Sequence, residues 1–256
     1  MRVDAASDVG KVRPRNEDAW VWRRIRTLEL LAVADGLGGH RAGDVASRLA
    51  LDELAKGLDV DGAETGEASR ESLLRAVRRA NQAVWEAARA RAEWQGMGTT
   101  LTAALVDGDR LTLAHVGDSR AYLWRAGSLR QLTSDHSLVQ ALVARGALSE
   151  EEAEHVPERH ILTRAVGTSP EVEVDVLEIR LEPGDRLVLA TDGLSAALNK
   201  EQVAALLAEG GDRPAHRLVE AANRGGAPDN VTVLVADLPA GGEEQDQTGL
   251  AAGGLG

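Results

Sequence analysis

The spacing of apolar and polar positions along this chain changes several times, and each change predicts a new element. Two tryptophans alternate with polar residues across residues 19–24, which is typical of a strand with one exposed face. Residues 28–34 (LELLAVA) are almost continuously apolar and stop at Asp35, followed by Gly36. Such a short apolar run, closed by a turn signal, predicts a strand that is buried on both faces.

Two long amphipathic helices are predicted after this strand. Apolar residues recur near helical spacing across residues 44–58 and again across residues 69–94, and a polar loop separates the two segments. Shorter helices are expected near residues 200–208 and 214–223. The remaining apolar runs predict strands at residues 99–106, 110–116, 121–125, 128–132, 172–180, 186–190 and 231–237. The first four of these follow one another through short turns, so we expect them to form one β-meander.

The order of these elements favours an α+β fold. Strands and helices occur in separate runs rather than in strand–helix–strand alternation, which indicates antiparallel sheets faced by helices. Residues 134–164 are polar and contain Pro157, so we expect them to lie outside the sheets as a flap-like segment. No internal linker is visible, and residues 1–238 are therefore predicted to be one domain. Residues 239–256 have low complexity and are expected to be a disordered tail.

Composition and charge exclude several classes of function. The chain has 41 Asp and Glu against 29 Lys and Arg, a formal net charge of −12. Nucleic acids and anionic membranes need a basic face, so neither is an expected partner. The absence of Cys excludes disulfide scaffolds, thiolate zinc sites and Cys nucleophiles. No apolar run approaches the length of a membrane span, and residues 1–11 lack a signal-peptide core, so the expected location is cytoplasmic.

The Asp-Gly pair occurs four times in this sequence, in two different settings. The pairs at Asp107 and Asp61 lie between alternating runs or in a polar loop, where a turn explains them. The pairs at Asp35 and Asp192 each close an almost continuous apolar run, LLAVADG and LVLATDG. A carboxylate at the end of a buried strand is costly to desolvate unless a positive charge compensates it, and no Lys or Arg is adjacent to either.

Two further aspartates share that setting. Asp118 follows the strand predicted at residues 110–116, and Asp229 opens the last strand. With Asp35 and Asp192 they place four carboxylates at the ends of core strands, where they could converge on one face. A cluster of hard oxygen ligands, without Cys or a His pair at zinc spacing, points to Mg²⁺ or Mn²⁺.

Six sequence blocks carry a resemblance to a known family. They are VRPRNEDAW (12–20), VADGLGGHRAGDVAS (33–47), GMGTTLTAALV (96–106), HVGDSRAYLWR (115–125), LATDGLS (189–195) and APDNVTVLV (227–235). In this order they resemble the metal-dependent Ser/Thr protein phosphatases of type 2C, the PPM family, in their bacterial form. The resemblance covers roughly residues 3–238. It implies a β-sandwich of two mostly antiparallel sheets flanked by helices, in four αββα layers.

The resemblance also implies a set of metal ligands. Asp35 would bridge two metal ions, and the carbonyl of Gly36 would bind the first of them. Asp192 and Asp229 would hold the second ion. Asp118, together with Asp192, would hold a weaker third ion. The implied cofactors are therefore two Mn²⁺ or Mg²⁺ ions and a third that binds less tightly.

Other residues in the same blocks are implied to act on water and phosphate. Asp18 and Glu17 would orient water molecules on the ions, and Arg13 would meet the substrate phosphate, because a guanidinium can donate to two oxygens at once. His40 is our candidate general acid, with a water on one of the ions as its rival. His136 and His160 fall in the flap-like segment, where they could meet substrate or have a structural role.

The implied activity is hydrolysis of phosphoserine and phosphothreonine in proteins by a water activated on a dinuclear Mn²⁺ or Mg²⁺ centre. The expected partners are phosphorylated proteins, namely bacterial Ser/Thr kinases and their substrates, and a monomer is expected. Two alternatives remain open. One is a hydrolase of small phosphoesters, and the other is a non-catalytic, phosphatase-like regulatory module. The presence of all four aspartates disfavours the second alternative.

Overall fold

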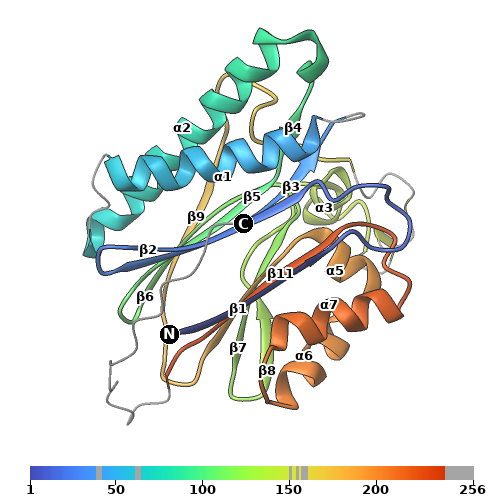
Figure 1. The fold of residues 1–256 in the computed structure, drawn as a ribbon. Coiled ribbons are helices and arrows are strands. Elements are labelled where there is room, and N and C mark those ends of the chain that lie inside the picture. Colours follow the sequence, from blue (N-terminus) through green and yellow to red (C-terminus); the bar gives the residue numbers. More distant parts are fainter. Residues whose placement is uncertain (39–41, 61–64, 150–151, 154–155, 157–160, 240–256) are drawn as a thin grey trace, which may run out of the picture.

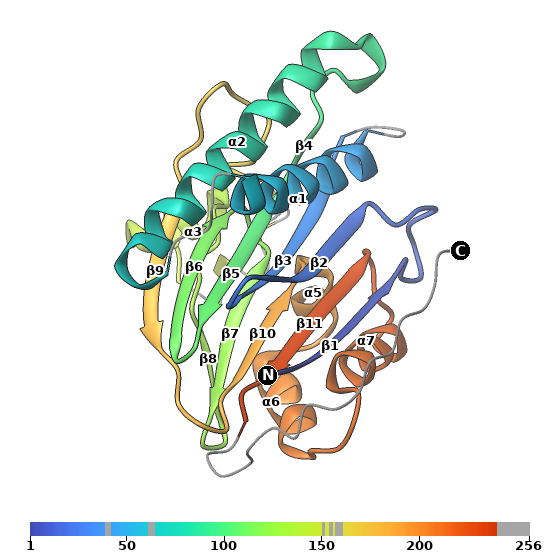
Figure 2. The same cartoon turned by 60° about the vertical axis from the view of Figure 1, so that its left-hand side comes forward.

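The computed structural model describes residues 1–38, 42–60, 65–149, 152–153, 156 and 161–239. In this part of the chain, two β-sheets pack face to face, and helices cover the outer face of each sheet (Figures 1 and 2). The predicted α+β class and the αββα sandwich are confirmed. None of the helices in the described ranges is long and apolar enough to cross a membrane.

The first sheet joins strands from both ends of the chain. Its order is β1-β11-β10-β7-β8, and all its neighbouring strands are antiparallel. The pairing of β1 with β11 runs from Arg2 opposite Asp237 to Asp8 opposite Val231. The strands are β1 (Arg2–Asp8), β7 (Arg120–Arg125), β8 (Ser128–Gln131), β10 (Arg186–Ala190) and β11 (Val231–Asp237).

The second sheet has the order β2-β3-β5-β6-β9, with the short strand β4 paired to the end of β3. These pairs are also antiparallel. The strands are β2 (Asp18–Ile25), β3 (Leu28–Leu37), β4 (Gly98–Thr99), β5 (Leu101–Asp107), β6 (Arg110–Val116) and β9 (Asp175–Arg180).

Helices form the two outer layers. The helices α1 (Gly43–Val60) and α2 (Ser69–Ala90) pack on the second sheet, with 3₁₀ turns at Gly66–Ala68 and Ala92–Trp94. On the first sheet lie α5 (Asp192–Ala197), α6 (Lys200–Ala208) and α7 (Pro214–Arg224). The helix α3 (Leu138–Ala144) lies within the flap-like segment, whose residues Ser137 and Leu162 form an isolated β-bridge.

The core explains why the central strands read as continuous apolar runs. In β3, Leu30 and Ala32 face α1 and α2, while Leu31 and Val33 face the other sheet. Successive side chains of a strand point to opposite faces, so a strand that is covered on both faces needs apolar residues at every position. β10 is built in the same way.

Several expected boundaries and one expected motif are wrong. The helix predicted at 69–94 ends at Ala90, because the chain turns out of the α conformation at Arg91 before the 3₁₀ turn. The strand predicted at 172–180 begins only at Asp175. The meander is split: β5 and β6 belong to the second sheet, whereas β7 and β8 belong to the first. The turn after β6 carries the chain from one sheet to the other, and local sequence does not specify which sheet a strand joins.

The strand β1 and the helix α5 have no counterpart among the predicted strands and helices. β1 is an edge strand in which Ala6 is its buried residue, so it lacks a clear apolar pattern. α5 begins at Asp192, directly where β10 was expected to end in a turn. The predicted tail begins at Pro239, and its residues from 240 onward lie outside the described part of the chain.

Candidate metal centre

The strand-end aspartates come together at one end of the sandwich. Asp35 lies near the end of β3, and Asp18, at the start of the antiparallel strand β2, is its direct register partner. Asp118 follows β6, which runs parallel to β3 within the sheet. From the first sheet, Asp192 follows β10 and Asp229 precedes β11. Antiparallel pairing places the end of one strand beside the start of the next, so all five residues lie at the same end of the sandwich.

Their carboxyl groups influence one another strongly. Burial raises the pKa of Asp35 well above its ordinary value, and the charges of Asp18, Asp192, Asp118 and Asp229 raise it further. Burial, more than any other cause, also raises the pKa of Asp18 to about 7. Asp118 behaves in the same way: burial, followed by the charge of Asp192, raises its pKa to about 7. A group of carboxyls that disfavour each other's charge is a feature of binding and catalytic sites.

Asp18 is the most deeply buried carboxyl of the group, at 7% exposure. Its Oδ2 accepts a hydrogen bond of 2.8 Å from the hydroxyl of Thr191, the residue before Asp192. Its Oδ1 is buried and has no hydrogen-bond partner among the described residues. A buried carboxylate oxygen without a donor is costly, and a cation or a water held by a cation would satisfy it.

The glycines after Asp35 and Asp192 have a different purpose from turn glycines. A Cβ on Gly36 would collide with the carbonyl oxygen of Gly43 at the start of α1, and a Cβ on Gly193 would collide with that of Asn230. By contrast, Gly108 has a φ of +59° and open space around it, as a hairpin turn requires. The glycines at the site therefore permit close backbone approach. The pair at Asp61 lies outside the described residues.

Arg13 brings a positive charge to this acidic end of the sandwich. Its Nη2 donates to Oδ2 of Asp229 at 2.6 Å, and its side chain remains 53% exposed. That hydrogen bond is the largest cause of its raised pKa, to which the charges of Asp35 and Asp192 also contribute. Arg13 is more than 200 positions from its partner Asp229, so the sequence around Asp229 did not reveal this counter-charge.

Asn230 holds the loop that carries Arg13 and Glu17. Its Nδ2 donates to the carbonyl oxygens of Val9 and Arg15, at 2.9 and 2.8 Å, and its Oδ1 accepts from the backbone N–H of Glu17 at 2.8 Å. Sequence reasoning missed this role, because the three contacts join segments more than 200 positions apart.

Glu17 lies between the loop and α1. Its carbonyl oxygen accepts from Gly36 N–H at 3.2 Å and from the hydroxyl of Ser47 at 2.6 Å. Burial, and then the charge of Asp44, raises the pKa of the Glu17 carboxyl. Asp44, in the first turn of α1, was also missed; its Oδ1 is buried without a partner in the described part of the chain. Its place within the block at residues 33–47 was the available signal.

The donor set fits hard divalent cations. All the candidate ligands are oxygens, which suits Mg²⁺ or Mn²⁺, and the buried Oδ1 of Asp18 lacks a donor. Within the described ranges, no three His, Cys, Asp or Glu side chains converge closely enough to be a ready-made metal shell. Carboxylates that repel one another are expected to stand apart until cations draw them together. His40 and His160 lie outside the described residues, and His136 lies beneath the Asp118 turn.

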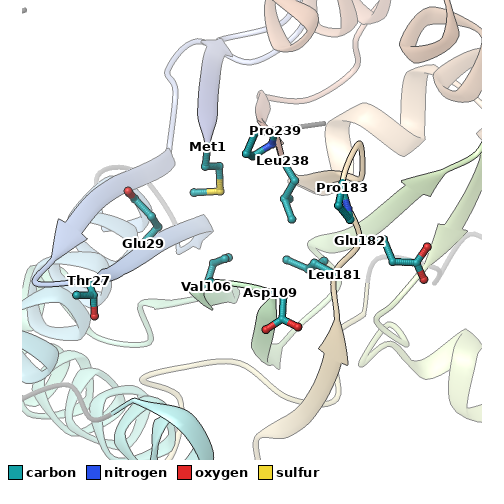
Figure 3. A pocket seen from close by; sticks show the side chains of 11 residues that line it. Met1, Thr27, Glu29, Val106, Asp109, Leu181, Glu182, Pro183, Leu238 and Pro239 are labelled. Carbon is teal, nitrogen blue, oxygen red and sulfur yellow. The ribbon is translucent and has the colours of Figure 1, made fainter. Parts of the chain in front are cut away.

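The opposite end of the sandwich has a different character. There the described residues line a cavity of about 340 Å³ between the two sheets (Figure 3). Most of its lining is apolar and includes Met1, Val106, Leu181 and Leu238. The buried carboxylate beside it, Glu29, accepts hydrogen bonds from Trp22 at 2.9 Å and from Arg24 at 2.8 Å. Glu29 is therefore neutralised by a neighbouring arginine.

Comparison with known proteins agrees with this geometry. The sequence pattern of the protein phosphatase 2C family matches residues 11–221. The serine/threonine protein phosphatase PstP of Mycobacterium tuberculosis is 46% identical over 239 residues, which cover 93% of this chain but 45% of that protein. This chain thus spans less than half the length of PstP. The serine/threonine phosphatase stp of Listeria monocytogenes is 36% identical over 241 residues, covering 93% of this chain and 96% of that protein.

A solved structure extends the comparison to the fold and to metal ions. The crystal structure of the PstP catalytic domain in complex with two manganese ions matches with a TM-score of 0.82 and 43% identity. The match covers 93% of this chain and 98% of that chain.

Proposed function

This chain belongs to the protein phosphatase 2C family, and on that premise we propose that it hydrolyses phosphoserine and phosphothreonine in proteins. The observation that carries the proposal is the convergence of the strand-end aspartates, among which burial and neighbouring carboxylates raise the pKa values of Asp18, Asp35 and Asp118. The manganese ions of the PstP structure support the same reading.

We assign the ion-binding groups as the resemblance implies. Asp35 and the Gly36 carbonyl would hold one ion, and Asp35 with Asp192 and Asp229 would hold the second. Asp118, with Asp192, would hold a third and weaker ion. Paired divalent ions, when bound, supply a water of lowered pKa and a clamp for in-line displacement at phosphorus.

Residues of the chain itself are placed to bind a phosphate at this end of the sandwich. Arg13 is half exposed and fixed beside the aspartates, where its guanidinium can donate to two phosphate oxygens. It would exchange its contact with Asp229 for one with the substrate. Asn230 keeps the Arg13 loop in place through its contacts with Val9 and Arg15.

Asp18 and Glu17 are assigned to orient water at the site. Thr191 donates to Oδ2 of Asp18, and the buried Oδ1, which has no donor among the described residues, is the atom we assign to accept from such a water. Glu17 is supported through its backbone by Gly36 and Ser47. His40 stays our candidate proton donor to the leaving alkoxide.

We propose phosphorylated cytoplasmic proteins as substrates, among them Ser/Thr kinases and their targets, with the chain acting as a monomer. The support for protein substrates is the activity in the names of PstP and stp. The test is hydrolysis of a phosphoserine peptide with added Mn²⁺. We expect turnover that stops with excess EDTA and is insensitive to okadaic-acid-type inhibitors. Full activity in excess chelator would refute the metal-dependent reaction.

A further inference from the structure

We propose that His136 is a positioning residue that sets the direction of the Asp118 carboxyl by holding the backbone of Gly117. The inference rests on the proposed function, because it concerns the aspartate assigned to the weaker third ion. It assigns a role to a buried histidine that the metal centre itself does not use.

His136 and Gly117 are joined by two hydrogen bonds. The backbone N–H of His136 donates to the Gly117 carbonyl at 2.7 Å, and the N–H of Gly117 donates to Nδ1 of His136 at 3.1 Å. The residue is 7% exposed, so water does not compete for these contacts. Asp118 is the next residue in the chain, and its backbone direction follows from that of Gly117.

The second ring nitrogen is fixed from the other side. Nε2 of His136 lies 3.1 Å from Oδ2 of Asp175 and 3.2 Å from Nη1 of Arg164. Because Nδ1 accepts from Gly117, we assign the ring proton to Nε2, where the Asp175 carboxylate is the available acceptor. Arg164 donates to Oδ1 of the same carboxylate at 2.7 Å. Although burial raises it, the pKa of Asp175 is lowered overall by its contacts with His136 and Arg164, which keeps it an anionic acceptor. A carboxylate of this kind fixes the tautomer and orientation of a histidine.

On the side away from His136, the turn at Gly117 and Asp118 packs against Thr100 and is held by hydroxyl contacts. Gly117 has a φ of +109°, and a Cβ there would collide with Thr100. The hydroxyl of Thr100 lies 2.6 Å from that of Ser119 and accepts from the backbone N–H of Asp35 at 2.9 Å. The Asp118 turn is thus held by Thr100 on the Asp35 side and by His136 on the flap side.

The ring of His115 packs beside that of His136. Its ring centroid is 4.7 Å from that of His136, and it contacts the Thr102 hydroxyl at 2.9 Å through Nδ1. Burial lowers its pKa to about 3, so it remains neutral and has a packing role.

His136 also ties the two ends of the flap-like segment to the turn. Its carbonyl oxygen accepts from Thr163 N–H at 2.8 Å, near the end of the segment. Its neighbour Asp135 accepts a forked contact from Arg120, with distances of 2.7 to 3.0 Å. A substitution at His136 is therefore expected to alter the backbone position of Gly117 and of both ends of residues 134–164.

Two substitutions separate the acceptor at Nδ1 from simple filling of space. In His136→Asn, the amide oxygen can take the place of Nδ1 and keep the contact with Gly117. In His136→Gln, the amide reaches the position of Nε2 instead, and the acceptor for Gly117 is lost. The matched control is His216→Gln on α7, where His216 also contacts a carboxylate, Asp4, at 3.0 Å but lies outside the site.

We expect His136→Gln to raise the Mn²⁺ concentration for half-maximal turnover on a phosphopeptide by about tenfold or more. His136→Asn should recover most of that loss, and His216→Gln should match the wild type. In metal-free protein, the amide of Gly117 should exchange with solvent faster in His136→Gln than in His136→Asn. Equal behaviour of the two His136 variants in both measurements would overturn the proposal.

A measurement on the unmodified protein guards against variants that do not fold. Nitrogen-15 shifts of the His136 ring in metal-free protein should show Nε2 protonated and Nδ1 as an acceptor. The opposite tautomer would overturn the positioning role. Absence of Mn²⁺-dependent hydrolysis by the wild type would instead refute the proposed function, while the ring shifts and Gly117 exchange would still decide the role of His136.

Discussion

The two ends of the sandwich treat buried carboxylates in opposite ways. At the end away from the site, Asp185 is 1% exposed and receives two hydrogen bonds from Arg125, at 2.8 and 2.6 Å. Burial raises the pKa of Asp185, but the contacts with Arg125 and with the Glu182 N–H outweigh it, and the pKa lies below its usual value. At the metal end, Asp18, Asp35 and Asp118 have raised pKa values.

The difference shows what distinguishes a structural carboxylate from a binding one. Both kinds are buried at the ends of strands, so burial alone does not separate them. The structural one is neutralised by a guanidinium that the fold supplies. The binding ones face one another, and the contact from Arg13 goes to Asp229, so Asp18, Asp35 and Asp118 need cations to compensate their charge.

The largest effect should come from removing a carboxylate at the metal end. Asp192→Asn should abolish turnover, because Asp192 is assigned to the second and third ions and the substitution removes its charge. Asp107→Asn, in the β5–β6 hairpin, should leave the kinetics near wild type, since an Asn oxygen can still accept from Gly66 N–H. Steady-state rates on a phosphopeptide test the pair, and similar behaviour of the two variants would contradict the distinction between site and turn.

The next effect compares the arginines of the two ends. Arg13→Ala should raise KM roughly 10- to 150-fold with a smaller change in kcat, because it removes a charged phosphate contact of about 1.5–3 kcal/mol. Arg125→Ala should leave KM unchanged and lower Tm, because it breaks the buried pair with Asp185. If Arg13→Ala instead reduced kcat at constant KM, Arg13 would act only in the transition state.

A smaller effect, of opposite sign at the two ends, is expected in the stability of metal-free protein. Asp18→Asn should stabilise it at pH 7.5 by at least about 1 kcal/mol, because a buried and repelled charge is removed. Asp185→Asn should destabilise it by about 2 kcal/mol, because the charge-assisted hydrogen bonds with Arg125 are weakened. Chemical unfolding in EDTA measures both.

The pH dependence of the same curves separates the two causes. The pKa of Asp18 is higher in the folded than in the unfolded protein, so its favourable contribution is present below about pH 4 and is lost as the pH rises through about 7. Metal-free wild type should therefore lose stability between pH 5 and 8, and Asp18→Asn should flatten that loss. The lowered pKa of Asp185 acts only in more acidic solution, so Asp185→Asn should keep the wild-type slope. A parallel slope for Asp18→Asn would contradict the account.

The central strands and the candidate metal ligands could be predicted from sequence, because a strand that is buried on both faces has a recognisable, almost continuous apolar run. The runs that became β3 and β10 are almost continuously apolar, and the aspartates that close them, Asp35 and Asp192, stand out for that reason. The same runs therefore predicted both the central strands and the candidate ligands. The edge strand β1 has no such apolar run and could not be predicted in this way.

What escaped prediction depends on contacts between distant segments. The transfer of the chain between sheets at the Asp118 turn has no local signature. Asn230 holds a loop more than 200 positions earlier, and His136 holds Gly117 from within the flap-like segment. Asn and His have many structural uses, so only the folded arrangement reveals these two.

The most direct test of the central claim is calorimetric titration of metal-free protein with Mn²⁺ at pH 7.5. The account predicts two tightly bound ions per chain for the wild type and for Asp185→Asn, and loss of tight binding in Asp35→Asn, which lacks the assigned bridging carboxylate. Unchanged Mn²⁺ binding by Asp35→Asn, or no tight binding by the wild type, would show that the strand-end carboxylates are not a metal centre.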